Sequence, residues 1–143
     1  MKSHRLRLPS LKAGYGTIQF VDCEGLSRGI ALFNTSAYFE AHEVLEDVWR
    51  EAPAGEKKFL QGLIQIAVGL HHHSQGNVAG ACSLLTRGAG NLAGCPEGFA
   101  GIDIASLRTA ALAWSRCLRE SITPPPPPRI KFREQRGRHP ATG

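Results

Sequence analysis

The chain has 143 residues, of which 42% are hydrophobic and 20% are charged. This length suits one domain with its own core rather than two, and the charged fraction is too low for an intrinsically disordered chain. The pI is about 9.3, yet residues 13–128 carry eight basic against eleven acidic groups. The excess positive charge belongs to the ends, so the pI alone is poor support for a folded body that binds nucleic acid.

The elements begin with a basic, extended N-terminal segment over residues 1–20, where glycine and proline alternate with basic groups without a sustained period. A helical bundle domain is expected over residues 21–122. Its first helix is predicted over residues 22–33. The Asn-Thr-Ser run at 34–36 offers three capping residues for a second helix, which ends near Glu51.

Three more helices are predicted after this pair. The third runs from about residue 56 to 75, and Asn77 caps a fourth that fades in the glycine-rich run 88–94. Asp103 caps the fifth, which extends to Ile122. No alternating β-branched run is long enough for a strand, and the connections are short. The sequence therefore predicts an all-α fold, a compact bundle of about five helices with short loops.

Residues 123–143 are predicted to form a polyproline and basic tail. Five consecutive prolines, 124–128, favour an extended polyproline rod about 15 Å long. The rest of the tail is basic and expected to be flexible, although Ile130 and Phe132, two residues apart, could pack on the bundle as a strap.

The second helix places a histidine and a glutamate among its apolar residues. On a helical wheel, His42 and Glu46 fall between Trp49 and Phe39, inside the apolar arc, whereas three other carboxylates share the opposite side: Glu40, Glu43 and Asp47. A carboxylate taken from water without a partner costs several kcal/mol, so burial requires compensation. His42 lies one turn before Glu46, within side-chain reach.

The third helix is expected to supply further partners for this pair. Gln65 and His72 lie on one stripe, bordered by two glycines that would let another helix approach closely. We expect the second and third helices to pack so that His42 and Glu46 meet Gln65 and either His72 or His71. Consecutive helical residues point about 100° apart, so His73 is expected to face water.

Two interpretations of this cluster stay open at this stage. One is a buried polar network that fixes helix register. The other is a polar pocket that binds a small molecule, formed by His42, Glu46, Gln65, His72, His71 and Trp49. It could hold a divalent metal through His42, Glu46 and His72, or an acid–base pair. No H-E-x-x-H or Glu-x-x-His motif occurs, so no cofactor is firmly implied and enzymatic activity stays open.

A hypothesis from another class uses the ends of the chain. Residues 1–12 carry four basic groups and residues 129–138 carry five, which would suit a nucleic-acid or protein-binding module acting through its termini. Homo-oligomerisation through an apolar helical face also stays open.

The expected cellular location rests on three negative observations. The four cysteines have no C-x-x-C spacing, and the N-terminus lacks the apolar run of a secretion signal. No window approaches the roughly 18 uninterrupted apolar residues of a membrane span. We therefore expect a soluble, cytoplasmic protein with reduced thiols and no membrane association.

Two runs carry a family resemblance, LFNTSAYFEAHEVLEDVWR (32–50) and FLQGLIQIAVGLHHHSQGNVAGACSLL (59–85). They resemble the bacterial family catalogued as domain of unknown function 309, whose pattern is an Asn before a helix with A-H-E-x-L-E-x-x-W, then L-I-Q-x-A, a late His and G-N-x-x-G-A. The resemblance covers roughly residues 28–92 and implies a small all-helical bundle without an established activity. The matched residues are Asn34, His42, Glu43, Glu46, Trp49, Gln61, Gln65, Gly76, Asn77, Gly80 and Ala81, with His71 or His72 as the late histidine.

Overall fold

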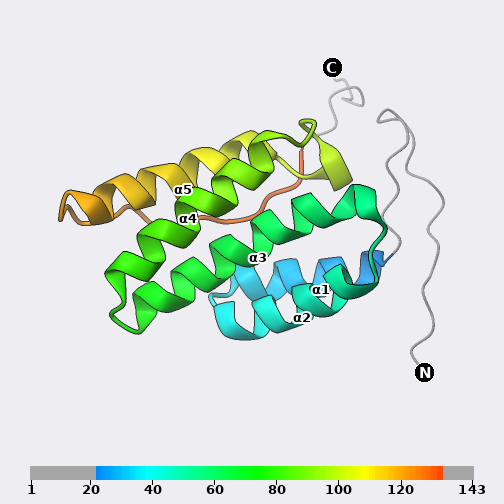
Figure 1. The fold of residues 1–143 in the computed structure, drawn as a ribbon, viewed down its shortest axis with the longest axis horizontal. Coiled ribbons are helices and arrows are strands. Elements are labelled where there is room, and N and C mark those ends of the chain that lie inside the picture. The colour runs from blue at the N-terminus through cyan, green and yellow to red at the C-terminus, as the bar shows by residue number, and fades with distance from the viewer. Residues whose placement is uncertain (1–21, 134–143) are drawn as a thin grey trace, which may run out of the picture.

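A computed structural model describes residues 22–133, and these fold into five α-helices and one short 3-10 helix (Figure 1). Backbone pairing between extended segments is limited, within this range, to one isolated bridge between Ile102 and Phe132. The predicted all-α bundle is confirmed. The elements are α1 (Cys23–Asn34), α2 (Tyr38–Glu51), α3 (Ala54–Ser74), α4 (Val78–Ala93), η1 (Phe99–Gly101) and α5 (Ile104–Arg119). The N-terminal segment predicted over residues 1–20 lies outside the described residues.

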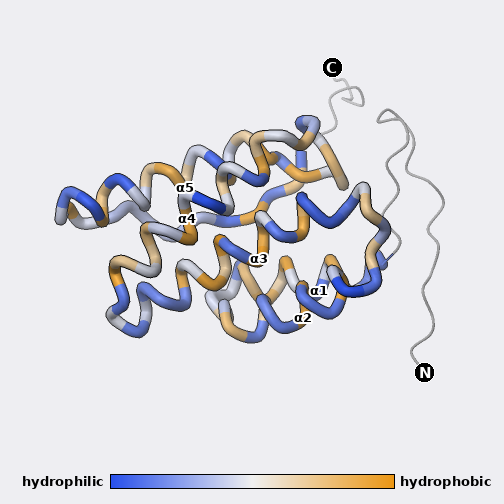
Figure 2. The backbone as a smooth tube through the Cα atoms, viewed as in Figure 1, coloured by the Kyte–Doolittle hydropathy of each residue, from blue (hydrophilic) through white to orange (hydrophobic). Residues whose placement is uncertain are grey.

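The helix α3 lies at the centre of the arrangement. It packs against α2 on one side and α4 on the other, while α1 pairs with α2 and α5 pairs with α4 (Figure 1). Hydrophobic and hydrophilic turns alternate along these helices, as expected when each buries only one face (Figure 2). As a result, α2 and the α4–α5 pair lie on opposite sides of α3.

Three helix starts differ in how they are capped. The Asn77 and Asp103 side chains accept hydrogen bonds from Gly80 N at 3.0 Å and Ser106 N at 3.1 Å, so both predicted caps are confirmed. The expected cap of α2 is wrong, because the N-cap residue is Ala37 and no side chain caps the first backbone N–H groups of that helix.

The turn between α1 and α2 instead closes through the backbone. Ala37 N donates to Leu32 O at 2.9 Å, and Ser36 takes a positive φ of 68°. Asn34 is the last residue of α1, and its side chain binds the C-terminal segment instead of capping α2. A helix can start without a side-chain cap where tertiary packing holds it in place, and α2 is held by its packing against α1 and α3.

Helices α3 and α4 cross closely because glycines stand at the crossing. A Cβ built on Gly88 would lie 2.9 Å from Gly62 O and 2.7 Å from Ile66 Cγ1, and one on Gly62 would lie 2.8 Å from Leu92. No side chain fits there without movement of the backbone. Packing against α3 also explains why α4 continues into the glycine-rich run 88–94 as far as Ala93. The sequence predicted that the helix would fade within this run.

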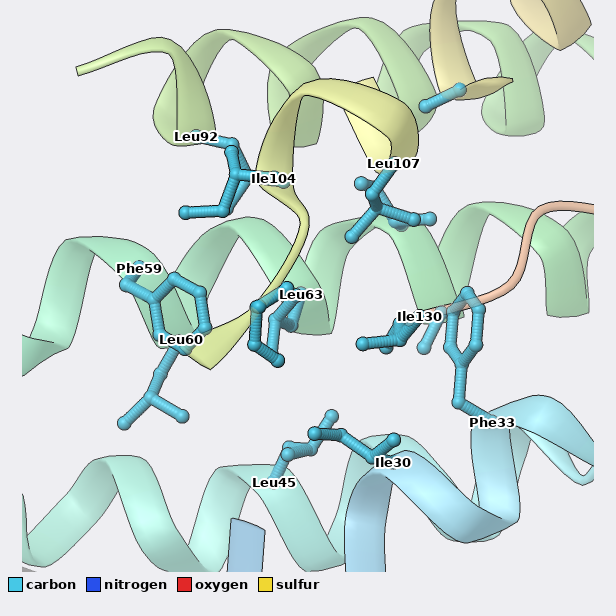
Figure 3. Close-up of a cluster of buried hydrophobic side chains, with 14 of the residues drawn as sticks. Ile30, Phe33, Leu45, Phe59, Leu60, Leu63, Leu92, Ile104, Leu107 and Ile130 are labelled. Carbon is cyan, nitrogen blue, oxygen red and sulfur yellow. The ribbon is translucent and has the colours of Figure 1, made fainter. Parts of the chain in front are cut away.

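The hydrophobic core runs between the two helix pairs. Figure 3 shows side chains of α1 and α2, such as Ile30 and Leu45, on one side of Leu63 and those of α4 and α5 on the other. Ile130 enters the same cluster beside Phe33 and is only 2% exposed. The core therefore includes a residue from beyond the last helix.

The segment 124–133 runs back along the bundle after α5 (Figure 1). Trp114 Nε1 donates to Pro125 O at 3.0 Å, and Asp103 N donates to Lys131 O at 2.8 Å. The strap that the sequence left open is thus present, and the folded body extends past residue 122 to include Ile130. Residues 134–143 of the predicted basic tail lie outside the described residues.

Candidate binding face on helix α2

The pair predicted from the sequence, His42 and Glu46, lies at the edge of the buried side of α2. His42 Nε2 is 3.8 Å from Glu46 Oε2, and His42 Nδ1 lies 3.1 Å from the carbonyl oxygen of Phe39. The histidine side chain is 20% exposed, whereas that of Glu46 is 45% exposed. The contact between the two residues is present, but the expected burial of Glu46 is wrong.

The reason lies in which residues of α2 face its neighbours. The buried residues are Ala41, Leu45 and Val48, and they form a narrow stripe toward α1 and α3. Glu46 stands about 100° from Leu45 around the helix, which places it beyond this stripe. Water therefore reaches the Glu46 side chain, which is 45% exposed, and no buried partner is required.

Charged side chains continue from this pair along α2. Glu46 Oε1 lies 4.0 Å from Arg50 Nη2, and Arg50 Nη1 bonds to Asp47 Oδ1 at 2.8 Å. All three side chains are well exposed, so these ion pairs add little to stability. They instead form a solvent-facing surface on which two carboxylates flank one guanidinium group.

An aromatic cluster joins α2 to the end of α3. The ring of Phe39 lies 5.3 Å from that of His42 and 5.2 Å from that of His71, measured between centroids. Phe39 is nevertheless 46% exposed. Four other large hydrophobic residues of the described range are also exposed, namely Val78, Leu112, Ile122 and Phe132. Phe39 combines such exposure with contacts to two imidazole rings.

We refer to this surface as the α2 face. It carries four acidic residues, one arginine, one histidine and one exposed aromatic ring: Phe39, Glu40, His42, Glu43, Glu46, Asp47 and Arg50. The arrangement of the α2 face was not predicted from the sequence, because the helical wheel placed Phe39 in the apolar arc. The missed signal was the position of Phe39 next to Glu43 and Glu46 at three-to-four spacing.

The two other predicted partners of the pair face α4 instead. Gln65 Oε1 accepts a hydrogen bond from Asn91 Nδ2 at 2.7 Å, and His72 Nδ1 lies 3.2 Å from Asn77 Nδ2. The glycines that border their stripe form the crossing with α4, so this stripe looks away from α2. The expected meeting of His42 and Glu46 with Gln65 and His72 is therefore wrong, and only His71 reaches the pair, through Phe39.

Trp49 and His73 occupy structural positions. Lys57 Nζ lies 4.1 Å above the centre of the Trp49 ring and donates to Trp49 O at 2.7 Å, which joins the end of α2 to the start of α3. His73 lies against Trp114 edge to face, with ring centres 5.0 Å apart. The expectation that His73 faces water is met only in part, because its side chain is partly buried against the Trp114 ring of α5.

The geometry does not assemble the predicted metal ligands. Within residues 22–133, no three side chains of His, Cys, Asp or Glu come together as a group that could hold a metal ion. His42 and Glu46 are neighbours, but His72 turns to Asn77 at the start of α4. The proposed set of His42, Glu46 and His72 is therefore not formed.

The basic ends are described only in part. Residues 1–21 and 134–143 lie outside the described range, so the alternative of binding through the termini concerns mainly residues on which the structure gives no information. Of the described basic residues in the strap, Arg129 donates to Asn34 O at 3.2 Å. As to membranes, none of the helices found between residues 22 and 133 is both long and apolar enough to cross one.

Comparison with known proteins tests the family resemblance. Residues 26–84 match the family model described as domain of unknown function (DUF309). An uncharacterised protein of Aquifex aeolicus (strain VF5) is 33% identical over 88 residues, which are 61% of this chain and 26% of that protein. The uncharacterised protein YpuF of Bacillus subtilis (strain 168) is 48% identical over 52 residues, 36% of this chain and 30% of YpuF. The matched part thus spans less than a third of either relative. The resemblance is confirmed for residues 26–84, the segment that matches the DUF309 family model.

Proposed function

We propose that the chain is a helical protein-binding module that recognises its partner through the α2 face. The observation that carries this proposal is the position of Phe39, a 46% exposed ring on a helix face that also carries four carboxylates. Buried aromatic anchors supply much of the energy of protein interfaces, and a rim of charge sets the orientation and speed of association. The α2 face combines both properties.

The contacts of Phe39 support its role as an anchor. Its ring is held between His42 and His71, so its position is fixed before a partner arrives. An anchor that is already ordered loses less side-chain entropy on binding than a mobile one. Partner chemistry follows from the surrounding charge: a basic surface with an apolar recess would complement this face.

An extended partner fits better than a small enclosed ligand. The residues that would have closed a pocket around His42, namely Gln65 and His72, are engaged with Asn91 and Asn77. The size of the relatives also supports a module, because the matched segment makes up only 26% of one relative and 30% of the other. Such a domain works beside other segments of a longer chain.

Site-specific photo-crosslinking tests the proposal. Benzoylphenylalanine replaces Phe39 in one version of the chain and Phe132, a still more exposed aromatic residue on the strap, in a control. We expect a discrete crosslinked adduct in cells of the native host from position 39 only. The adduct should disappear in the Glu43→Lys/Asp47→Lys variant, because reversal of two charges repels a basic partner. Equal adducts from both positions, or none from position 39, would contradict the proposal.

A further inference from the structure

A shallow groove, open to solvent, lies between α4 and α5 and forms a second distinctive surface. It has a volume of about 810 Å³ and is lined mainly by apolar atoms. Val78, Cys82 and Leu118 contribute the apolar part, and Arg87 and Arg119 add two guanidinium groups. Val78 is among the most exposed large apolar residues of the described range.

A buried polar cluster holds the wall of this groove in place. Ser115, only 1% exposed, lies with its hydroxyl 2.9 Å from that of Thr86, and Arg119 Nη1 donates to it at 3.3 Å. Cys82 Sγ donates to Ser115 O at 3.7 Å. These bonds join the two helices across the groove, so its shape and one of its two arginines are fixed by the fold.

The charge of this surface is opposite to that of the α2 face. Between their first and last residues, α4 and α5 contain four arginines and no acidic residue: Arg87, Arg108, Arg116 and Arg119. The helix α2 contains five acidic residues and one arginine. Because α2 and the α4–α5 pair lie on opposite sides of α3, the two charges are separated across the molecule (Figure 1).

We propose that the α2 face of one copy docks into the α4–α5 groove of a second copy. Phe39 would lie on the apolar residues of the groove, with Glu43 and Asp47 opposite Arg87 and Arg119. This inference rests on the proposed function and names its partner. The α2 face requires a partner surface that is basic and partly apolar. The α4–α5 groove of this same chain has both properties, so a second copy is the favoured partner.

The geometry sets the kind of assembly. The two surfaces do not overlap, so one copy can use both at once and the contact is head to tail, which builds rings or chains rather than a closed twofold dimer. A symmetric contact of two α4–α5 surfaces would bring arginines together and is disfavoured.

Two blocked variants test the contact. Glu43→Lys/Asp47→Lys removes the α2 face and leaves the groove, while Arg87→Glu/Arg119→Glu does the reverse. Because Arg119 also bonds to Ser115, Arg87→Glu alone serves as a second groove variant with that bond intact. Glu24→Lys and Arg28→Glu, both exposed on α1, are the matched charge-reversal controls. Circular dichroism and thermal unfolding show which variants keep the fold.

The readout is sedimentation velocity over a range of concentrations at low and high salt. The unaltered chain should form species that grow beyond a dimer and weaken with salt. Each blocked variant alone should stay monomeric, with association at least about tenfold weaker. An equal mixture of the two should regain association, because the unaltered α2 face of one variant meets the unaltered groove of the other, and the two charge-reversed surfaces also complement each other. Both controls should behave as the unaltered chain.

Three results would overturn the inference: a monomeric unaltered chain, association that survives in a folded blocked variant, or a mixture that stays monomeric while the unaltered chain associates. Crosslinking at position 39 separates these from failure of the proposed function. A charge-dependent adduct with a different protein would leave the α2 face as the binding surface and show that the partner is not a second copy. Loss of that adduct as well would contradict both.

Discussion

The side chain of Asn34 binds Ile130 through both polar groups of that residue's backbone. Asn34 Oδ1 accepts from Ile130 N at 2.8 Å, and Asn34 Nδ2 donates to Ile130 O at 2.9 Å, across 96 positions of sequence. This pair fixes the strap at the point where Ile130 enters the core. A single side chain at the end of α1 thus couples the C-terminal segment to the bundle.

Replacement of Asn34 should therefore destabilise the whole domain. Asn34→Ala removes two hydrogen bonds from the backbone of a buried residue, and we expect a loss of about 2–3 kcal/mol in the free energy of unfolding. Urea denaturation followed by circular dichroism measures it. Thr35→Ala, at the exposed neighbouring position, should cost far less. Equal losses in the two variants would show that the strap contact is unimportant.

The α3–α4 crossing predicts opposite effects at two glycines of α4. Gly88→Ala places a methyl group 2.9 Å from Gly62 O and should destabilise the domain by about 1–3 kcal/mol. Gly90→Ala, where nothing lies within 4 Å, should stabilise it by about 0.5–1 kcal/mol, because alanine favours a helix. Thermal unfolding measures both variants, and a stabilising Gly88→Ala would contradict the close crossing.

Gln65 should behave as a structural residue that supports α4. A double-mutant cycle of Gln65→Ala and Asn91→Ala should give a coupling free energy of about 0.5–1.5 kcal/mol, the usual value of a hydrogen bond. Neither substitution should alter the crosslinked adduct formed at position 39. An additive cycle combined with loss of the adduct would show that Gln65 is part of the binding site and not a structural residue.

Two thiols should make stability fall at alkaline pH. Burial raises the pKa of Cys95 above the ordinary 9.0, against the opposing effect of Lys58. Burial, with the negative charges of Asp22 and Glu56, raises the pKa of Cys23 as well. The unfolded chain then loses thiol protons at lower pH than the folded one, so stability is complete below about pH 8.5 and falls above it toward the folded pKa values.

The measurement is the free energy of unfolding from neutral pH to about pH 10, compared between the unaltered chain and the Cys23→Ser/Cys95→Ser variant. The variant should show a shallower decline. An identical slope for both proteins would contradict the raised pKa values.

The sequence predicted the elements better than their contacts. Apolar periodicity and the caps Asn77 and Asp103 located the helices, because these are local properties of the chain. The turn at 34–36 could not be predicted in the same way: the side chain of Asn34 is used by Ile130, which lies far away in sequence. Capping residues can serve either purpose, and only the fold decides between them.

The candidate site was predicted in part for a related reason. The contact of His42 with Glu46 follows from their spacing within one helix. A helical wheel gives the direction of a side chain but not which neighbour it meets, so the stripe with Gln65 was assigned to α2 although it faces α4. The position of the close α3–α4 crossing, set by Gly62 and Gly88, was the deciding fact.

Phe39 can be removed with little effect on folding, which makes it the best position for a functional test. It is nearly half exposed, so Phe39→Ala should cost less stability than the loss of a fully buried phenylalanine, about 3–5 kcal/mol. Thermal unfolding of Phe39→Ala beside Phe132→Ala measures the cost. Unfolding of the Phe39 variant at ambient temperature would mean that the ring is mainly a core residue.

The central claim is that the α2 face is the surface through which the chain binds its partner. Its most direct test is the affinity of the crosslinked partner, once purified, for the unaltered chain, Phe39→Ala and Phe132→Ala by isothermal titration calorimetry. For a partner that is a second copy, sedimentation velocity of each of the three chains alone gives the same comparison, because every head-to-tail contact of Phe39→Ala then lacks the ring. We predict a loss of at least about tenfold for Phe39→Ala, equivalent to about 1.4 kcal/mol, and no change for Phe132→Ala. Equal affinities of the unaltered chain and a folded Phe39→Ala variant would contradict the claim.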